Sequence, residues 1–203
     1  MPSIYQLKPG FQRLLAPLLN ALIRSGISPN QITLLAMSLS LLFGAALAYF
    51  GQAAQNRWLW AAFPFAMLLR MAMNAIDGML ANATGNKTRL GALLNELCDQ
   101  ISDAALYLPF ALLPGIAAPL LVVTVVLALL AEFAGVAAVL VGTARRFDGP
   151  MGKSDRAFAF GLLALLAYFQ LAPLWLNSLL ALVLLLAACT VINRLRLALA
   201  PAP

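Results

Sequence analysis

The chain of 203 residues is 63% hydrophobic and only 10% charged, with a mean hydropathy of +0.92 and a net charge of +6. A soluble domain of this length cannot bury that much apolar surface, so the composition excludes a soluble enzyme and predicts a polytopic membrane protein. Histidine is absent, which excludes imidazole metal sites, and any bound metal must use oxygen ligands, as Mg²⁺, Mn²⁺ and Ca²⁺ do. Both cysteines lie in apolar segments and indicate no disulfide framework.

The first expected element is an amphipathic helix over residues 5–25. One broad face consists mainly of leucine, and lysine, arginine and glutamine supply the polar character. This pattern is typical of a helix that lies on the inner membrane surface, and packing of the same face on the protein itself is the alternative. The following SPN sequence favours a break before the next helix, with Ser28 or Asn30 as the N-cap.

Six apolar segments follow, each close to the roughly 20 residues that a membrane-spanning helix needs. They cover residues 31–51, 57–81, 89–112, 116–143, 156–172 and 174–197. Short linkers and the lack of an internal repeat indicate a single domain over residues 1–203, with a six-helix bundle at 31–197. The sequence therefore predicts an all-α polytopic membrane protein with six transmembrane helices after the amphipathic helix.

The basic residues indicate how the bundle is oriented. All Lys and Arg residues except Arg57 and Arg70 lie before the first segment, in the second and fourth linkers, or near the end of the last segment. In a six-span topology these regions share one side, which is expected to be the cytoplasm. Arg57 is expected outside, and Arg70 lies within the second segment. The chain is thus expected to be a multi-pass protein of the cytoplasmic (inner) membrane with both termini in the cytoplasm.

Four of the seven acidic residues lie between positions 74 and 103, on the second and third segments. Asn74 and Asp77 share one helical face, while Asn95, Asp99 and Asp103 recur every four residues on another. The linker is short, so the two helices are expected to form a hairpin that brings these side chains together. Each carboxylate at mid-bilayer costs roughly 2.5–3.5 kcal/mol. Three interpretations would explain how this cost is offset: the carboxylates bind a divalent cation, they belong to a structural polar network, or they line an ion or proton pathway.

A transport pathway requires polar residues that continue across the membrane. After Asp103 the segment reads AALYLPFALL, so its polarity ends there and the pattern favours a cytoplasmic pocket closed at its far end. Gly78, Ala81 and Gly91 are small residues near the carboxylates, and they leave backbone accessible to a flat or phosphate-bearing ligand. A nucleotide pyrophosphate fits such a pocket.

These residues resemble the signature of the CDP-alcohol phosphotransferase (CDP-alcohol phosphatidyltransferase) family, D-x2-D-G-x2-A-R-x8-G-x3-D-x3-D. Every spacing is kept, and the matching positions are Asn74, Asp77, Gly78, Ala81, Asn82, Gly91, Asn95 and Asp99. Asparagine replaces aspartate at positions 74 and 95 and arginine at position 82, so this is a divergent member. SPNQIT at 28–33, the six-span layout and GPMGKSDRAF at 149–158 extend the resemblance over most of the chain.

The resemblance implies a membrane enzyme of phospholipid biosynthesis. It would transfer a phosphatidyl or other substituted phosphate group from a CDP-alcohol, expected to be CDP-diacylglycerol, to an alcohol acceptor with release of CMP. Mg²⁺ or Mn²⁺ dependence and a homodimer are also implied, and membrane lipids rather than nucleic acid are the expected surroundings. Asp99 is the expected catalytic base. The expected metal ligands are Asn74, Asp77, Asn95 and Asp99, with Asp103 as a further carboxylate that restores charge.

The remaining candidate residues are expected to contact the two substrates. The nucleotide candidates are Gly78, Ala81, Asn82, Gly91, Asn30 and Thr33, with Lys87 or Arg89 as replacements for the missing signature arginine. The acceptor candidates, in the linker RRFDGPMGKSDR, are Arg145, Arg146, Lys153 and Arg156. Ordinary positive-inside bias is the alternative explanation of this linker. Its GKS is not a P-loop, because Phe147 stands where that motif needs glycine.

Glu132 is a lone acid in the fourth segment, and a structural role is expected for it, paired with Arg70 or another adjacent polar group. The small residues around Gly135 permit close helix packing, within the bundle or in a dimer. Two other functions compete with phosphotransfer. One is a degenerate family member that binds nucleotide or lipid without turnover, and the other is a transporter.

Overall fold

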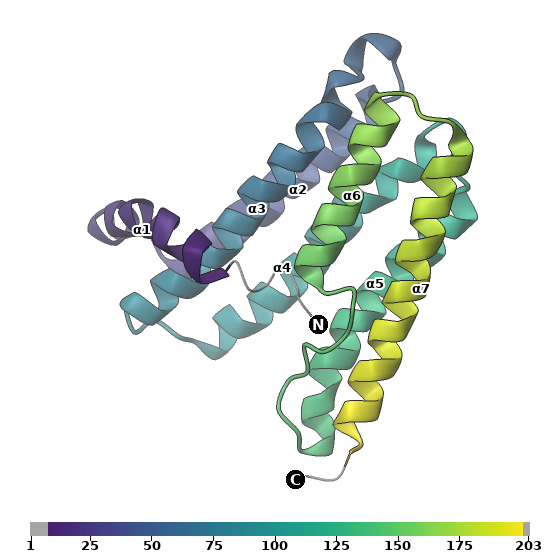
Figure 1. Ribbon diagram of the computed structural model, residues 1–203. Coiled ribbons are helices and arrows are strands. Elements are labelled where there is room, and N and C mark those ends of the chain that lie inside the picture. The colour runs from purple at the N-terminus through teal and green to yellow at the C-terminus, as the bar shows by residue number, and fades with distance from the viewer. Residues whose placement is uncertain (1–7, 201–203) are drawn as a thin grey trace.

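The chain is helical throughout most of residues 8–200, the part that this computed structural model describes (Figure 1). The α-helices are α1 (Lys8–Arg24), α2 (Pro29–Phe50), α3 (Trp58–Ala83), α4 (Arg89–Tyr107), α5 (Ala118–Ala137), α6 (Lys153–Tyr168) and α7 (Pro173–Ala198). Short 3₁₀ turns are η2 (Ala54–Asn56), η3 (Leu108–Leu112) and η4 (Ala138–Val141). The all-α prediction is confirmed, and each of the six expected apolar segments corresponds to one helix, α2 to α7.

Local sequence signals explain where two of the helices begin and end. Ser28 starts α2 with a capping box: its Oγ accepts from the Gln31 backbone N–H at 3.3 Å, and Gln31 Oε1 accepts from the Ser28 N–H at 2.8 Å. Of the two expected caps, Ser28 is therefore the one used. Pro109 follows the end of α4, and because proline lacks an N–H the chain continues only as the 3₁₀ turn η3.

Four helical stretches of the described chain are long and apolar enough to cross a membrane. They are Pro29–Phe50, Ala54–Ala83, Ala118–Val141 and Pro173–Ala198. Helix α6 has 16 residues, and its length of about 24 Å is less than the roughly 30 Å of a bilayer core. Helix α4 carries the acidic residues. Length and composition thus support four spans, and the count of six remains a prediction.

Helix α1 lies beside the bundle (Figure 1) and packs on α2 and α3. Leu15, Leu19 and Leu22 contact a small buried cluster from those two helices. Leu14 and Leu18 lie elsewhere on the helix and are 75% and 49% exposed. Packing on the protein therefore accounts for part of the apolar surface of α1, and the exposed leucines are available to a membrane surface. Residues 5–7 of the expected helix lie outside the described part of the chain.

The main core contains an aromatic cluster that joins α3, α4, η3 and α6. Trp60, Phe63, Tyr107, Phe110 and Phe160 are at most 1% exposed. The rings of Tyr107 and Phe160 stack with their centroids 3.9 Å apart, and Phe110 meets Phe63 edge to face at 5.1 Å. Tyr107 comes one helical turn after the last acidic residue of α4. The aromatic core therefore closes the bundle beyond the acidic residues, as the sequence predicts for a closed pocket.

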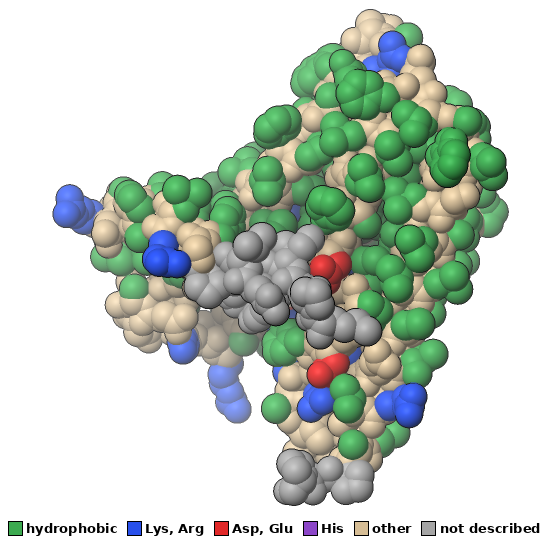
Figure 2. All heavy atoms as spheres, viewed as in Figure 1, with side chains coloured by type: hydrophobic (Ala, Val, Ile, Leu, Met, Phe, Trp, Pro, Cys, Tyr) green, Lys and Arg blue, Asp and Glu red, His purple; other side chains and the backbone are tan. Residues whose placement is uncertain are grey.

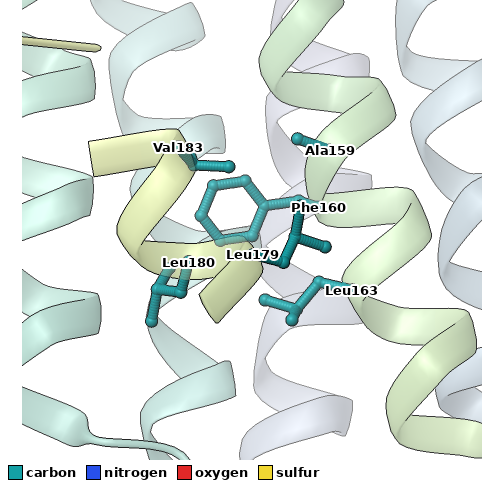
Figure 3. Close-up of a pocket in the computed structure, with 6 residues that line it drawn as sticks. All are labelled: Ala159, Phe160, Leu163, Leu179, Leu180 and Val183. Atoms are coloured by element: carbon teal, nitrogen blue, oxygen red, sulfur yellow. The ribbon is translucent and has the colours of Figure 1, made fainter. Parts of the chain in front are cut away.

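A small space between α6 and α7 is apolar throughout (Figure 3). It is lined by Ala159, Phe160, Leu163, Leu179, Leu180 and Val183. The ring of Phe160 points from α6 toward α7 in Figure 3. None of these six side chains is polar. The space is therefore an apolar gap between two packed helices, and no side chain that lines it could bind a phosphate group.

The outer surface has the character of a protein in contact with lipid. Hydrophobic side chains cover most of the visible face over α6 and α7, and charged side chains gather around α1 and the lower end of the view (Figure 2). Large apolar residues are exposed on several helices, for example Leu42 (69%) and Phe65 (73%). So much exposed apolar surface is unusual in a soluble monomer and agrees with the composition.

Candidate functional site

The two helices that carry the signature residues meet through Asn74 and Asp99. Asn74 Nδ2 of α3 donates to Asp99 Oδ1 of α4 at 2.9 Å. Arg70, one turn earlier on α3, donates from Nη2 to the Asp99 backbone oxygen at 2.9 Å and lies 3.5 Å from Oδ1. Side chains of the two segments therefore meet, and two residues of the expected metal-ligand set are in direct contact. The helices themselves pack mainly on α2 rather than closely against each other, so the expected helical hairpin is not formed as such.

Asp77 is buried between α2 and α3, at 6% exposure. Thr33 of α2 donates from Oγ1 to Asp77 Oδ2 at 2.7 Å. A hydrogen bond to a carboxylate both satisfies the buried oxygen and fixes its orientation. Thr33, expected to contact the nucleotide, thus contacts an expected metal ligand.

Gly91 lies where the first turns of α2 and α4 meet. A Cβ added to it would be 2.9 Å from Asn30 Oδ1 and 3.1 Å from Thr88 Oγ1. Thr88 Oγ1 accepts from the Gly91 N–H at 2.9 Å and so caps α4. Only glycine fits here without displacing a neighbour. Two of the nucleotide candidates, Asn30 and Gly91, are therefore side by side.

Three other nucleotide candidates lie on the last two turns of α3. Gly78 and Asn82 are exposed and Ala81 is half-buried. A Cβ on Gly78 would have no neighbour within 4 Å. This part of α3 is therefore open surface that a ligand can approach, whereas Gly91 is in close contact with α2.

Lys153 connects the acceptor candidates to the expected base. It is the first residue of α6, and its Nζ forms an ion pair with Asp99 Oδ2. The start of α6 is held by Asp155, whose Oδ2 accepts from the Gly152 N–H at 3.1 Å. Asp99 therefore bonds Asn74 through one carboxylate oxygen and Lys153 through the other.

Asp103 is placed deeper in the bundle, in a buried ion pair. It is 2% exposed, and its carboxylate lies 2.5 Å from Arg70 Nη1 and 3.3 Å from Arg156 Nη2. Arg156 is fully buried. The structure thus joins an expected metal ligand to an expected acceptor contact, and each satisfies the charge of the other.

Three guanidinium groups from different segments lie near the Glu132 carboxylate. Its Oε1 lies 3.0 Å from Arg156 Nη1 and 3.3 Å from Arg194 Nη1, and its Oε2 lies 3.6 Å from Arg145 Nη2. Of the expected alternatives, pairing with another polar group is observed rather than pairing with Arg70. Arg194 joins the network although nothing in its sequence context indicated this.

The basic linker is held against α5. Arg145 forms an ion pair with Glu96 of α4, and Arg146 Nε lies 2.9 Å from Asp148 Oδ2. The Arg146 N–H donates to the Gly135 carbonyl at 3.0 Å, and a Cβ on Gly135 would be 2.5 Å from the Arg146 oxygen. Gly135 therefore lets the backbone of the linker lie close against α5, whereas the expectation for this small residue was close packing between helices.

By donor type the four expected metal ligands suit one divalent ion; the structure brings two of them, Asn74 and Asp99, into contact, and a shared metal site remains a prediction. Within residues 8–200, no group of three or more Asp, Glu, His or Cys side chains could hold a metal ion, because asparagine occupies two signature positions. What remains is two carboxylates, Asp77 and Asp99, and two amides, Asn74 and Asn95. Their oxygens are the ligands that Mg²⁺ and Mn²⁺ prefer, and their charge of −2 balances one such ion.

The comparison with known proteins establishes the family. The chain belongs to the CDP-alcohol phosphatidyltransferase family, whose model matches residues 26–194. The resemblance found in the signature is thereby confirmed over most of the chain.

Relatives and solved structures agree with this assignment. Inner membrane protein YnbA of Escherichia coli (strain K12) is 44% identical over 196 residues, which are 96% of this chain and 95% of that protein. Phosphatidylinositol phosphate synthase of Mycobacteroides abscessus is 31% identical over 102 residues, 48% of this chain but only 41% of that enzyme.

Crystal structures of Mycobacterium tuberculosis phosphatidylinositol phosphate synthase share the fold. The complex with manganese and citrate has a TM-score of 0.74 at 20% identity and covers 92% of both chains. The complex with CDP-DAG has a TM-score of 0.70 at 20% identity and covers 94% of this chain and 99% of that one.

Proposed function

We propose that this protein transfers the phosphatidyl group of CDP-diacylglycerol to an alcohol and releases CMP, in phospholipid biosynthesis. The observation that carries the proposal is the position of Asp99. Its side chain is 18% exposed and joins Asn74 of the signature to Lys153 of the basic linker. It thus lies where a nucleotide on one side and an alcohol on the other would meet. Family membership and the CDP-DAG bound by a protein of the same fold support the choice of donor.

In the proposed reaction Asp99 accepts the proton of the acceptor hydroxyl. The hydroxyl oxygen then forms a bond to the β-phosphorus, the bond from that phosphorus to the oxygen of CMP breaks, and CMP leaves with the electron pair. Asn74 and Lys153 orient the two oxygens of the base. A bound Mg²⁺ or Mn²⁺, held by Asn74, Asp77, Asn95 and Asp99, would neutralise charge on the pyrophosphate.

The substrate contacts are proposed from how exposed each candidate side chain is. Asn30, Gly91 and the open end of α3 around Gly78 form the nucleotide side. Arg145 and Lys153, which are 33% and 30% exposed, form the acceptor side. Asp103 and Arg156 are buried against each other, so we assign them a structural role.

The membrane arrangement is also a proposal. Helices α4 and α6 pack against the candidate spans α2 and α3, respectively, which supports six spans in one domain. Four candidate spans and the inner membrane relative support a multi-pass protein of the inner membrane. Both termini would then be cytoplasmic, with α1 on the inner surface. A homodimer is proposed from the resemblance alone.

The test is metal-dependent CMP release from purified protein in detergent, with CDP-diacylglycerol, Mg²⁺ or Mn²⁺, and a panel of alcohols. Asp99→Asn should abolish CMP release. Asp148→Asn is the matched control, since the Asp148 carboxylate pairs with Arg146 of the same linker and is 41% exposed; this variant should keep its activity. Unchanged turnover in Asp99→Asn would show that the assignment of the base is wrong.

A second candidate function is binding of CDP-diacylglycerol without turnover. The two asparagines at signature positions favour it, because they halve the charge available to a metal. Binding of CDP-diacylglycerol with no CMP release from any acceptor would identify this function. A transport pathway is disfavoured, because the aromatic core around Tyr107 and Phe160 closes the bundle beyond the acidic residues.

A further inference from the structure

We propose that the exposed tryptophan and tyrosine side chains of this protein bind the outer boundary of the bilayer as one belt, and that the hydrocarbon layer is thinned beside α6. The belt consists of Tyr49, Trp58, Tyr168 and Trp175. It extends the membrane arrangement proposed above, and it does not depend on phosphotransfer.

Exposed tryptophan and tyrosine gather at one end of the bundle. Within residues 8–200, two of these side chains are fully buried in the aromatic cluster, and the others form the belt and are between 36% and 82% exposed. Tyr49 lies at the end of α2, Trp58 at the start of α3, Tyr168 at the end of α6 and Trp175 in the first turn of α7. The two turns that join these helix ends lie in the upper part of Figure 1.

Exposed phenylalanine is distributed differently. Phe65 and Phe158, which are 73% and 64% exposed, lie within α3 and α6 rather than at their ends. An indole N–H or a phenol O–H can bond to lipid headgroups while its ring contacts acyl chains, and Trp and Tyr therefore gather at membrane interfaces. Phenylalanine carries no such group. Residue type and exposure together thus distinguish the interface from the hydrocarbon interior.

Helix α7 gives the distance from the belt to the opposite boundary. Its exposed cation Arg196 lies about 32 Å from Trp175 along the helix axis, at roughly 1.5 Å per residue. This length is close to the roughly 30 Å of a bilayer core. One helix thus carries an aromatic residue at one boundary and a cation at the other, as the belt requires.

Helix α6 is too short for a bilayer of this thickness. Its 16 residues run from Lys153 to Tyr168, a length of about 24 Å. Phe158 and Leu162, 64% and 37% exposed, are available to lipid along this helix. Figure 1 shows that α6 begins well above the lower ends of α5 and α7.

The linker before α6 cannot make up the difference. Residues 142–152 are not helical, and the Asp148 carboxylate among them is 41% exposed. Irregular backbone in contact with acyl chains would leave its polar groups without partners, so such segments do not face the hydrocarbon layer. The hydrocarbon beside α6 therefore extends from Tyr168 to about Lys153, and a bilayer meets a short span by thinning.

The belt is tested by tryptophan fluorescence of the full chain in phosphatidylcholine vesicles, with lipids brominated either near the headgroup or deep in the acyl chain. Trp58→Phe leaves Trp175 as the exposed fluorophore, and Trp175→Phe leaves Trp58. The double variant retains only buried Trp60 and gives the background. Bromine near the headgroup should quench each exposed tryptophan at least 2-fold more than deep bromine.

The depth control is Phe65→Trp in the double variant. This tryptophan lies about 10 Å further along α3 than Trp58, so deep bromine should quench it more strongly. Equal or stronger quenching of Trp58 and Trp175 by deep bromine overturns the belt. No quenching by either lipid also overturns it, because a second copy of the chain would then cover these side chains. Thermal unfolding verifies that the variants are folded.

Thinning is tested with brominated lipids whose acyl chains have fourteen, eighteen or twenty-two carbons. Lipid beside Trp175, next to the end of α6, should bind at least 2-fold more tightly with the shortest chains than with the longest. Trp58, between the longer helices α2 and α3, should report a weaker preference. The same preference at both tryptophans, or a preference for the longest chains at Trp175, overturns thinning beside α6. CMP release in the same vesicles is a separate readout: its absence refutes the proposed function, while the quenching still decides the belt.

Discussion

Replacement of Asp103 by asparagine is expected to destabilise the fold and to leave metal binding intact. The Asp103 carboxylate is 2% exposed and lies 2.5 Å from Arg70 and 3.3 Å from Arg156. Removing one partner of a buried ion pair costs roughly 3–5 kcal/mol. Arg70 keeps its bond to Asp99 and Arg156 keeps its bond to Glu132, so the lower end of this range applies. A loss of about 3 kcal/mol changes the folding equilibrium roughly 150-fold.

Thermal unfolding in detergent, with a parallel Mn²⁺ titration followed by electron paramagnetic resonance, measures both effects. A loss of 3 kcal/mol lowers the Tm of a chain of this size by about 6–12 °C. Asp148→Asn is the matched control, because its ion pair with Arg146 is exposed and contributes less than about 1 kcal/mol. If Asp103→Asn unfolds at the wild-type temperature and no longer binds Mn²⁺, Asp103 is a metal ligand and the reasoning is refuted.

Two further substitutions test the contacts between α2 and the site. Gly91→Ala places a Cβ 2.9 Å from Asn30 Oδ1 and is expected to raise the KM for CDP-diacylglycerol several-fold. The control is Gly10→Ala, whose added Cβ meets nothing within 4 Å and which should leave this KM unchanged. Equal KM values for the two variants would contradict the prediction. Thr33→Val removes the 2.7 Å bond to Asp77 and should lower stability by about 1–3 kcal/mol in thermal or denaturant unfolding, since a buried carboxylate oxygen loses its partner. A variant as stable as the wild type would show that water or another donor replaces Thr33.

Helices and their faces could be predicted because their signals are local. The apolar segments were found from length and hydropathy alone, and Ser28 was one of two caps expected for α2. Periodicity correctly placed Asp99 and Asp103 on the face of α4 that meets α3, as their contacts with Arg70 confirm. The helix face on which each of these residues lies therefore follows from residue spacing within a single helix.

The ionic partners could not be predicted in the same way. Spacing within one helix says nothing about which side chain of another helix will face it. Lys153 was expected near an acceptor, and it pairs with Asp99 only because the start of α6 lies against α4. Glu96 pairs with Arg145, which comes from a distant linker. Glu132 likewise required the packing of α5 against α7 to reach Arg194.

The shared ion pairs also make membrane assembly of this bundle an ordered process. Asp103 can meet Arg70 as soon as α3 and α4 are both in place, but its second partner, Arg156, is synthesised later with α6. Glu132 in turn lacks Arg194 until α7 is complete. Each charge left without its partner in lipid carries a cost of a few kcal/mol. A nascent chain that stops short of α6 therefore leaves Glu132 without its nearest partner, Arg156, and Arg194 of α7 then completes the network.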